Sequence, residues 1–138
     1  MLRLSQALAD QISAHATETY PLECCGLTVA REDGSGWVAE AVHPSENLSD
    51  NPQTRFEVDM RLRLTLQKDL RGTGSAVIGH YHSHPDGPPA PSAKDLEQAW
   101  EDRLVWVIVG VEGGNSTLKA YEYRDDEKAF LPLAVEAT

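Results

Sequence analysis

The sequence VIGHYHSHP at residues 77–85 joins an apolar run to a histidine at every second position, and Ser92 and Asp95 follow shortly afterwards. Side chains alternate in direction along an extended chain, so we expect His82 and His84 on one face of a strand. A loop can then bring Asp95 back to them as a third ligand. Three protein ligands with an open fourth position is the arrangement of a catalytic zinc, whereas structural zinc sites have four protein ligands. The stretch therefore predicts a strand that carries a catalytic metal site.

The segment Ser92-Ala93-Lys94-Asp95 also has a purely structural interpretation. Serine is a favourable N-cap, and a carboxylate in the first turn of a helix interacts well with the positive end of the helix dipole. The two interpretations are compatible, because a first-turn carboxylate points outward at the start of a helix. His80 falls on the same face as His82, and we expect it to have a structural role.

Outward from this stretch, the pattern of apolar residues predicts alternating helices and strands. Leu4, Leu8 and Ile12 recur every four positions and indicate an amphipathic helix over Leu4–Thr19, which Pro21 ends. Trp100 and Trp106 are expected in the core, and the tail after Asp125 has no clear assignment. Further helices are expected over Asp59–Leu70 and Ser92–Asp102, and strands over Leu22–Ala30, Trp37–Val42, Ser75–His82, Leu104–Val111 and Leu118–Tyr123. The fold class is therefore mixed α/β (α+β), with a mixed sheet flanked by helices in a single domain over residues 1–138.

Composition limits the partners and the compartment. The chain has 138 residues, with 12 Lys and Arg against 22 Asp and Glu, for a formal net charge of −10. Nucleic acid is therefore not an expected partner, because its binding rests mainly on neutralising phosphates. Cys24 and Cys25 are adjacent, which disfavours a disulfide, and free thiols fit a cytoplasmic location. No apolar run approaches the length needed to cross a bilayer, so no membrane association is expected.

The order and spacing of the metal-site residues resemble the JAMM motif, also called MPN+, of metal-dependent isopeptidases. The motif is matched by His82-x-His84, seven residues, Ser92, two residues and Asp95, with Pro85 after the second histidine. An apolar, glycine-containing strand precedes it at Val77-Ile78-Gly79. The family also has a glutamate on an early strand followed by a glycine, and Glu23-Cys24-Cys25-Gly26 fits that position. The resemblance implies a JAMM/MPN fold, which is similar to that of cytidine deaminase.

The resemblance also implies a role for each residue of the motif. His82, His84 and Asp95 would hold one Zn²⁺ per chain, with water in the fourth position. Glu23 would act as general base and then as general acid, and Ser92 would donate a hydrogen bond to the oxyanion. Two imidazoles and a carboxylate suit zinc best, but they also accept iron or cobalt.

Members of this family cleave the amide bond after the C-terminal Gly-Gly of ubiquitin or a ubiquitin-like protein. The larger members carry two insertions that bind the ubiquitin chain, and 138 residues leave little room for either. The chain thus resembles the minimal prokaryotic form, which is associated with ubiquitin-like sulfur carriers. The expected partner is a ubiquitin-like or sulfur-carrier protein with a C-terminal Gly-Gly.

Three other classes of protein are alternatives to this interpretation. The RadC-like branch usually has His-Asn-His-Pro-Ser-Gly where this chain has His82-Ser83-His84-Pro85-Asp86-Gly87, and its historical link with DNA fits poorly with the acidic composition. A zinc deaminase requires His-x-Glu and Pro-Cys-x-x-Cys, and the chain has neither. A non-catalytic MPN interaction module that retains the ligands stays open, as does the oligomeric state.

Overall fold

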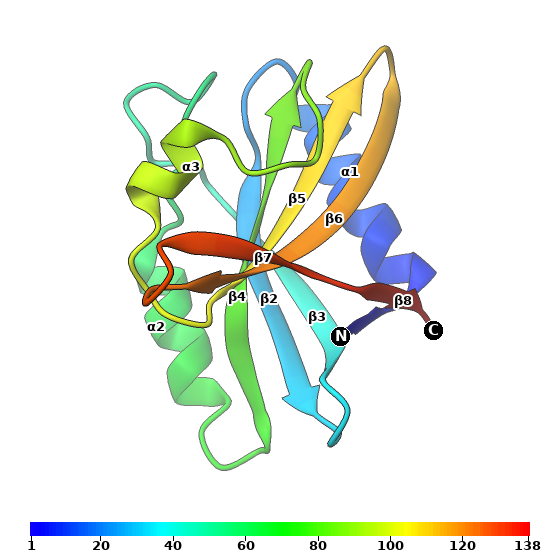
Figure 1. Ribbon diagram of the computed structural model, residues 1–138, viewed down its shortest axis with the longest axis vertical. Helices are drawn as coiled ribbons and strands as arrows, with labels where there is room; N and C mark the ends of the chain where they lie inside the picture. The colour runs from blue at the N-terminus through cyan, green and yellow to red at the C-terminus, as the bar shows by residue number, and fades with distance from the viewer.

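One strongly curved mixed sheet organises this protein in a computed structural model that describes residues 1–138 (Figure 1). The order of strands in the sheet is β7-β6-β5-β4-β2-β3-β1-β8. Helices cover the sheet from both sides. In chain order, the elements are β1 (Leu2–Leu4), α1 (Gln6–Thr19), β2 (Cys25–Glu32), β3 (Trp37–Ser45), α2 (Met60–Asp69), β4 (Ser75–Pro85), α3 (Ala93–Gln98), β5 (Val105–Glu112), β6 (Asn115–Arg124), β7 (Ala129–Leu133) and β8 (Val135–Ala137).

Strand β4 lies in the middle of the sheet, where it pairs antiparallel with β2 and parallel with β5. In this register His82 lies beside Cys25 on one side and Ile108 on the other. The histidine strand is therefore held by backbone hydrogen bonds along both edges. A strand fixed in this way gives its side chains well-defined positions.

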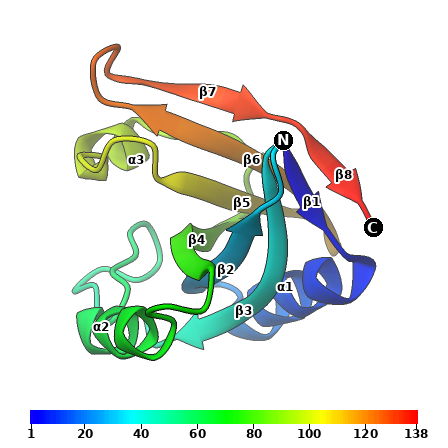
Figure 2. The ribbon, with the colours of Figure 1, turned by 90° about the horizontal axis from the view of Figure 1, so that it is seen from below.

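The two ends of the sheet are joined by a single residue. Strands β7 and β8 are consecutive in the chain but lie at opposite ends of the strand order, and Ala134 connects them. Strand β8 pairs parallel with β1, and the Leu2 N–H donates to the Ala134 carbonyl at 2.8 Å. The sheet therefore curls until its ends meet, and the terminal strands β1 and β8 lie side by side (Figure 2).

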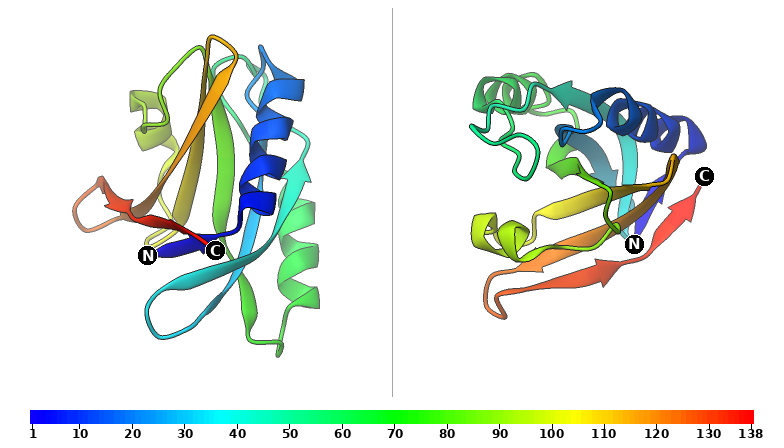
Figure 3. Two further views of the ribbon diagram at one scale, coloured as in Figure 1. Left: turned by 90° about the vertical axis from the view of Figure 1, so that its right-hand side faces the viewer. Right: turned by 90° about the horizontal axis from the view of Figure 1, so that it is seen from above.

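Alternation along the strands divides the buried residues between the two faces of the sheet. Helix α1 packs its buried residues Ile12 and Ala16 into the larger core, which includes Tyr81 of β4 and Val107 of β5. The opposite face carries a smaller cluster around Trp106. Helices α2 and α3 lie apart from α1, at this second side of the sheet (Figure 3). His82 and His84 alternate with Tyr81 and so belong to the second side.

The fold class expected from the sequence is confirmed, and the helix expected over Asp59–Leu70 is α2, with Asp59 as its N-cap. Other boundaries differ. Helix α1 begins at Gln6 because Leu2–Leu4 form β1, with Ser5 as the N-cap between them. Strand β4 continues through His84 to Pro85, since it stays paired with β5 over this length. No helix is long and apolar enough to cross a membrane.

The third helix is shorter than expected, and one core assignment is wrong. Helix α3 ends at Gln98 because Ala99 adopts an extended backbone. Trp100 therefore leaves the helix, and it is 72% exposed instead of lying in the core. Trp106 is buried as expected, at 3% exposure. Cys24 and Cys25 are both buried and free, which confirms that they form no disulfide.

Candidate active site

The two histidines of the motif meet on the second side of the sheet. His82 is fully buried and His84 is half-buried, and their Nε2 atoms lie 3.1 Å apart. Phe56 stacks on the His82 ring with a centroid distance of 4.1 Å and an interplanar angle of 14°. The His84 Nδ1–H donates to the Pro88 carbonyl at 3.0 Å, which leaves Nε2 free to bind a metal. Both rings are thus oriented by protein contacts.

The loop that follows His84 lies close against the backbone of β5. A Cβ at Gly110 would lie only 2.5 Å from the Gly87 carbonyl oxygen and 2.8 Å from the Pro88 carbonyl carbon. Only glycine leaves room at this position, so the loop after β4 can lie directly on β5. The loop then turns back to start α3, and in this way it brings Asp95 to the histidines.

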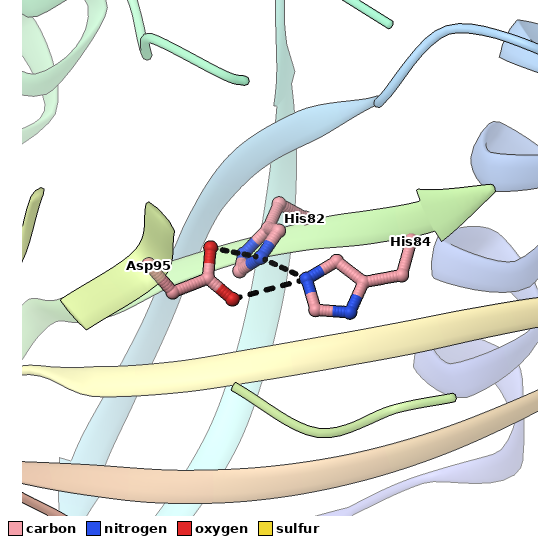
Figure 4. A group of neighbouring side chains, drawn as sticks. All are labelled: His82, His84 and Asp95. Atoms are coloured by element: carbon pink, nitrogen blue, oxygen red, sulfur yellow. Dashed lines mark hydrogen bonds and ion pairs between the residues drawn. The ribbon is translucent and has the colours of Figure 1, made fainter. Parts of the chain in front are cut away.

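Asp95 is held by the start of helix α3. The Ser92 Oγ accepts from the Asp95 N–H at 3.1 Å, and the Asp95 Oδ2 accepts from the Ser92 N–H at 2.9 Å, which forms a capping box. The carboxylate is 3% exposed. Its Oδ2 lies 3.0 Å from the His84 Nε2, and its Oδ1 lies 3.2 Å from the His82 Nε2. The capping role and the ligand-like position therefore coexist in one residue, whose carboxylate points toward both histidines in Figure 4.

The three side chains offer a donor set that fits a single small cation. The Nε2 atoms of the two histidines lie 3.1 Å apart, and each lies 3.0–3.2 Å from a different oxygen of Asp95. Tetrahedral ligands about 2.0–2.1 Å from a zinc ion are about 3.3 Å apart, so the two imidazoles already have nearly the separation of two zinc ligands. Two imidazoles and one carboxylate are also the ligand types that zinc accepts. The residues present thus fit a metal ion.

Electrostatics in the metal-free protein match this arrangement. Burial alone would raise the pKa of Asp95, but hydrogen bonds to His82 and His84 outweigh it and hold that pKa far below its ordinary value. Burial would likewise lower the pKa of His84, but its hydrogen bond to Asp95 and the charge of that carboxylate raise it. Burial lowers the pKa of His82, despite its own hydrogen bond to Asp95. The site therefore keeps a carboxylate ionised in a buried position, where it favours a cation.

Glu23 approaches from the segment just before β2. Its N–H donates to the Pro52 carbonyl at 2.8 Å, and its own carbonyl accepts from the Asn47 Nδ2 at 3.0 Å. These bonds replace strand pairing, so Glu23 lies two residues before β2 and not on the strand as expected. The residue is 6% exposed, and burial raises the pKa of its carboxyl to about 7, with the neighbouring charges of His84, Asp95 and Lys94 as smaller influences.

A polar cleft of about 240 Å³ connects these groups. Glu23, His84 and Ser92 all line it, together with Gln53, Thr54, Pro85, Gly87 and Lys94. The Ser92 Oγ accepts one hydrogen bond from the backbone, so its O–H remains able to donate into the cleft. The structure thus brings together all five residues that the sequence singled out: Glu23, His82, His84, Ser92 and Asp95.

The other candidate residues have different environments. His80 is 8% exposed and lies between Phe56 and Trp106, with ring centroids 4.9 and 4.3 Å away, and it does not join the three clustered ligands. Phe56 supports the His82 ring by stacking on it. Gln53, Thr54 and Lys94 line the cleft, and sequence reasoning missed them. Of these three, only Lys94 could have been found from the sequence, because it is adjacent to Asp95 in the motif.

Comparison with known proteins gives consistent results. The profile of a family described as prokaryotic homologues of the JAB domain matches residues 5–124. A desampylase from Haloferax volcanii is 32% identical over 98% of this chain and 96% of its own length. A protein described as a probable TtuB-protein conjugate cleaving protease, from Thermus thermophilus, is 32% identical over 82% of this chain and 72% of its own length.

Solved structures share the fold. The solution structure of a protein from Desulfitobacterium hafniense is 32% identical and superimposes with a TM-score of 0.87, over 100% of this chain and 93% of that one. The crystal structure of a JAB1/MPN domain protein from Archaeoglobus fulgidus is 20% identical, with a TM-score of 0.64 over 100% of this chain and 99% of that one. At that identity the second likeness concerns the fold alone, and it is the mixed α+β fold of a JAB1/MPN domain.

Proposed function

This chain belongs to the family of prokaryotic homologues of the JAB domain, and from this premise we propose that it is a zinc-dependent isopeptidase of the JAMM type. It would hydrolyse the amide bond after the C-terminal Gly-Gly of a ubiquitin-like or sulfur-carrier protein. The observation that carries the proposal is the meeting of three metal-ligand side chains with Glu23 and Ser92 at one polar cleft. The names of two relatives, which describe cleavage of conjugates of small modifier proteins, support the same class of substrate.

His82, His84 and Asp95 would hold the metal ion. The contacts of Phe56 with His82 and of Pro88 with His84 fix both rings, and the capping box fixes the carboxylate. When bound, zinc supplies Lewis acidity, which polarises a carbonyl group and makes water more acidic. The protein contributes ligands that are already in position before the metal arrives.

Glu23 is the group that moves the proton. Hydrolysis forms a bond from the water oxygen to the carbonyl carbon of the terminal glycine and breaks the bond from that carbon to the leaving nitrogen. The Glu23 carboxylate accepts a proton from water and then donates it to the leaving nitrogen. In the metal-free protein burial raises the pKa of this carboxyl to about 7, near the pH at which a group can both accept and donate a proton.

Ser92 would stabilise the negative charge that develops on the carbonyl oxygen. Its hydroxyl already accepts a hydrogen bond from the Asp95 N–H, so the hydroxyl proton is directed elsewhere. It lines the cleft together with Glu23. A single donor of this kind is worth about 2.7–4 kcal/mol in the transition state.

The test combines metal content with turnover. Protein purified without added metal is analysed for zinc, and it is then assayed on a ubiquitin-like protein extended past its C-terminal Gly-Gly. We expect about one zinc per chain and cleavage after the second glycine, with both lost on chelation. Glu23→Gln should keep the zinc and lose about 10²–10⁴-fold in turnover.

Two outcomes would refute the proposal. Turnover of Glu23→Gln at the parent rate would remove Glu23 from its role. A zinc-loaded parent that cleaves no Gly-Gly adduct but still binds a ubiquitin-like protein would favour the interaction module.

A further inference from the structure

Asn47, which follows β3, uses every hydrogen bond that its side-chain amide can make. Its Nδ2 donates to the carbonyl oxygens of Glu23 and Arg55, each at 3.0 Å. Its Oδ1 accepts from the N–H groups of Ser49 and Glu57, also at 3.0 Å. Carbonyl groups only accept and N–H groups only donate, so these partners fix the orientation of the amide. One half-buried side chain thus ties together four backbone groups of an irregular part of the chain.

This amide matters for the candidate active site because Glu23 is held through its backbone. Both hydrogen bonds of Glu23 are formed by main-chain atoms, since its N–H donates to the Pro52 carbonyl and its carbonyl accepts from Asn47. Pro52 itself belongs to the loop that the amide of Asn47 shapes, between the groups of Ser49 and Arg55 to which the amide is bonded. The position of the buried Glu23 carboxyl group therefore depends on this loop.

The residue after Glu23 is fixed to the strand that carries the two histidines. The Cys24 N–H donates to the Ser83 Oγ at 2.8 Å, and the Cys24 carbonyl accepts from the Ser83 N–H at 3.1 Å. Ser83 is fully buried and lies between His82 and His84 in β4. Glu23 thus lies between two anchors, with β4 on one side and the loop on the other. Loss of the loop anchor would leave both histidines on β4 but release the backbone of Glu23.

We propose that Asn47 is a positioning residue, whose amide sets the carboxyl group of Glu23 against the three metal-ligand side chains. This inference rests on the proposed function and adds a residue on which its proton transfer depends. Asn47 does not line the cleft, so it acts through Glu23 and not by contact with the substrate. Proton transfer is sensitive to such an arrangement, because the group must come within hydrogen-bonding distance of the atoms that it serves.

The experiment removes the donor half of the amide. Asn47→Asp keeps an oxygen that can accept from Ser49 and Glu57, but it places a second oxygen opposite the Glu23 carbonyl. The substrate is a ubiquitin-like protein extended past its Gly-Gly. We expect kcat to fall about 10–100-fold, because misplacing a reacting group by about 1 Å costs up to about 10²-fold. KM and the zinc content should stay close to those of the parent, because the side chain of Asn47 neither lines the cleft nor bonds to a metal ligand.

A double-mutant cycle separates positioning from a general effect on folding. In a Glu23→Gln background, Asn47→Asp should cause little further loss of kcat, because the group that Asn47 positions is already disabled. A general loss of folded protein would lower kcat by the same factor in both backgrounds. Asn51→Asp is the matched control, because it introduces the same charge into the same loop at an exposed side chain. It should keep the parent kcat.

A measurement on the parent tests the inference even if Asn47→Asp does not fold. Both Nδ2 protons of Asn47 donate to backbone carbonyls, so NMR should show that they exchange with solvent more slowly than those of the exposed Asn51. Equally fast exchange would overturn the inference. A parent-like kcat in zinc-loaded Asn47→Asp, or equal losses in both backgrounds, would also overturn it while the proposed function stands. A zinc-loaded parent that cleaves no Gly-Gly adduct would overturn both.

Discussion

His80 and His84 lie four residues apart on the same face of β4, yet one is enclosed by aromatic rings and the other opens onto the polar cleft. Burial between Phe56 and Trp106 lowers the pKa of His80 well below its ordinary value and keeps the ring neutral. At the other end, the hydrogen bond to Asp95 raises the pKa of His84. The same residue type on the same strand thus acquires a packing role or a ligand-like role through neighbours contributed by other segments.

The largest effect on zinc binding should come from Asp95, which contacts the His84 end of β4. Asp95→Ala removes one of the three donor groups and leaves His82 and His84 without their shared carboxylate. We expect zinc content to fall from about one per chain to a small fraction of that, a greater loss than the roughly 10–100-fold in affinity that outer-shell substitutions cost. Elemental analysis measures it, with Asp50→Ala at an exposed position as the control. Full zinc content in Asp95→Ala would show that this end of β4 is not a metal site.

Phe56 contacts both His80 and His82, and its substitution should have an intermediate effect on zinc affinity. Phe56→Leu removes the ring that stacks on His82 and also contacts His80. We expect about a tenfold loss of zinc affinity, because the His82 ring is less well oriented, and a loss of about 1 kcal/mol in unfolding free energy. Competition with a chromophoric chelator gives the affinity, and chemical denaturation of the metal-free protein gives the stability. An unchanged affinity would mean that β4 alone orients His82.

The protein should tolerate the loss of the His80 imidazole, which is enclosed by aromatic rings at the other end of β4. In His80→Phe a buried Nδ1 without a hydrogen-bond partner is replaced by an apolar ring of similar shape. Removing an unsatisfied polar atom is worth about 1–3 kcal/mol, and accommodating a larger ring offsets part of that gain. We expect unchanged zinc content and a Tm that is higher by about 2–4 °C. Loss of zinc in this variant would place His80 among the groups that the metal requires.

The smallest effect is a pH dependence of the metal-free protein. The pKa of His84 is higher in the folded state than its ordinary value of 6.5, so its pairing with Asp95 stabilises the fold fully below that value. This stabilisation is lost as pH rises through the raised pKa. The Tm of chelator-treated protein should therefore decline slightly above neutral pH. The decline should be smaller in His84→Gln but not absent, because the raised pKa of Glu23 contributes a decline of the same sign. A Tm that rises over this range in the parent would contradict the pairing.

The sequence predicted the site better than the elements around it. His82 and His84 were placed on one face by strand periodicity, and the capping sequence placed Asp95 in the first turn of a helix, both by local rules. The catalytic roles of Glu23 and Ser92 and the binding of zinc by His82, His84 and Asp95 stay predictions. Gln53 and Thr54 reach the cleft from an irregular loop, and no periodicity reports where such a loop lies.

The errors concern features that only tertiary contacts decide. Three-residue strands such as β1 and β8 have too little local pattern to be recognised. Strand β1 forms because it pairs with β3 and β8, and β8 forms because it pairs with β1. Trp100 was assigned to the core by residue type alone. The early end of α3 determines its exposure, and the helical pattern gave no sign of that end.

The single-residue connection at Ala134 has a consequence for how the protein is made. Leu2 and Leu4, which are almost completely buried, are synthesised well before their pairing partner β8, which begins only at Val135. Pairings between such distant residues carry a high entropic cost and raise the contact order, which slows folding. The pairing of β1 with β8 is therefore expected to form late in folding. We expect the paired termini to exchange their amide hydrogens sooner than the central strands β4 and β5.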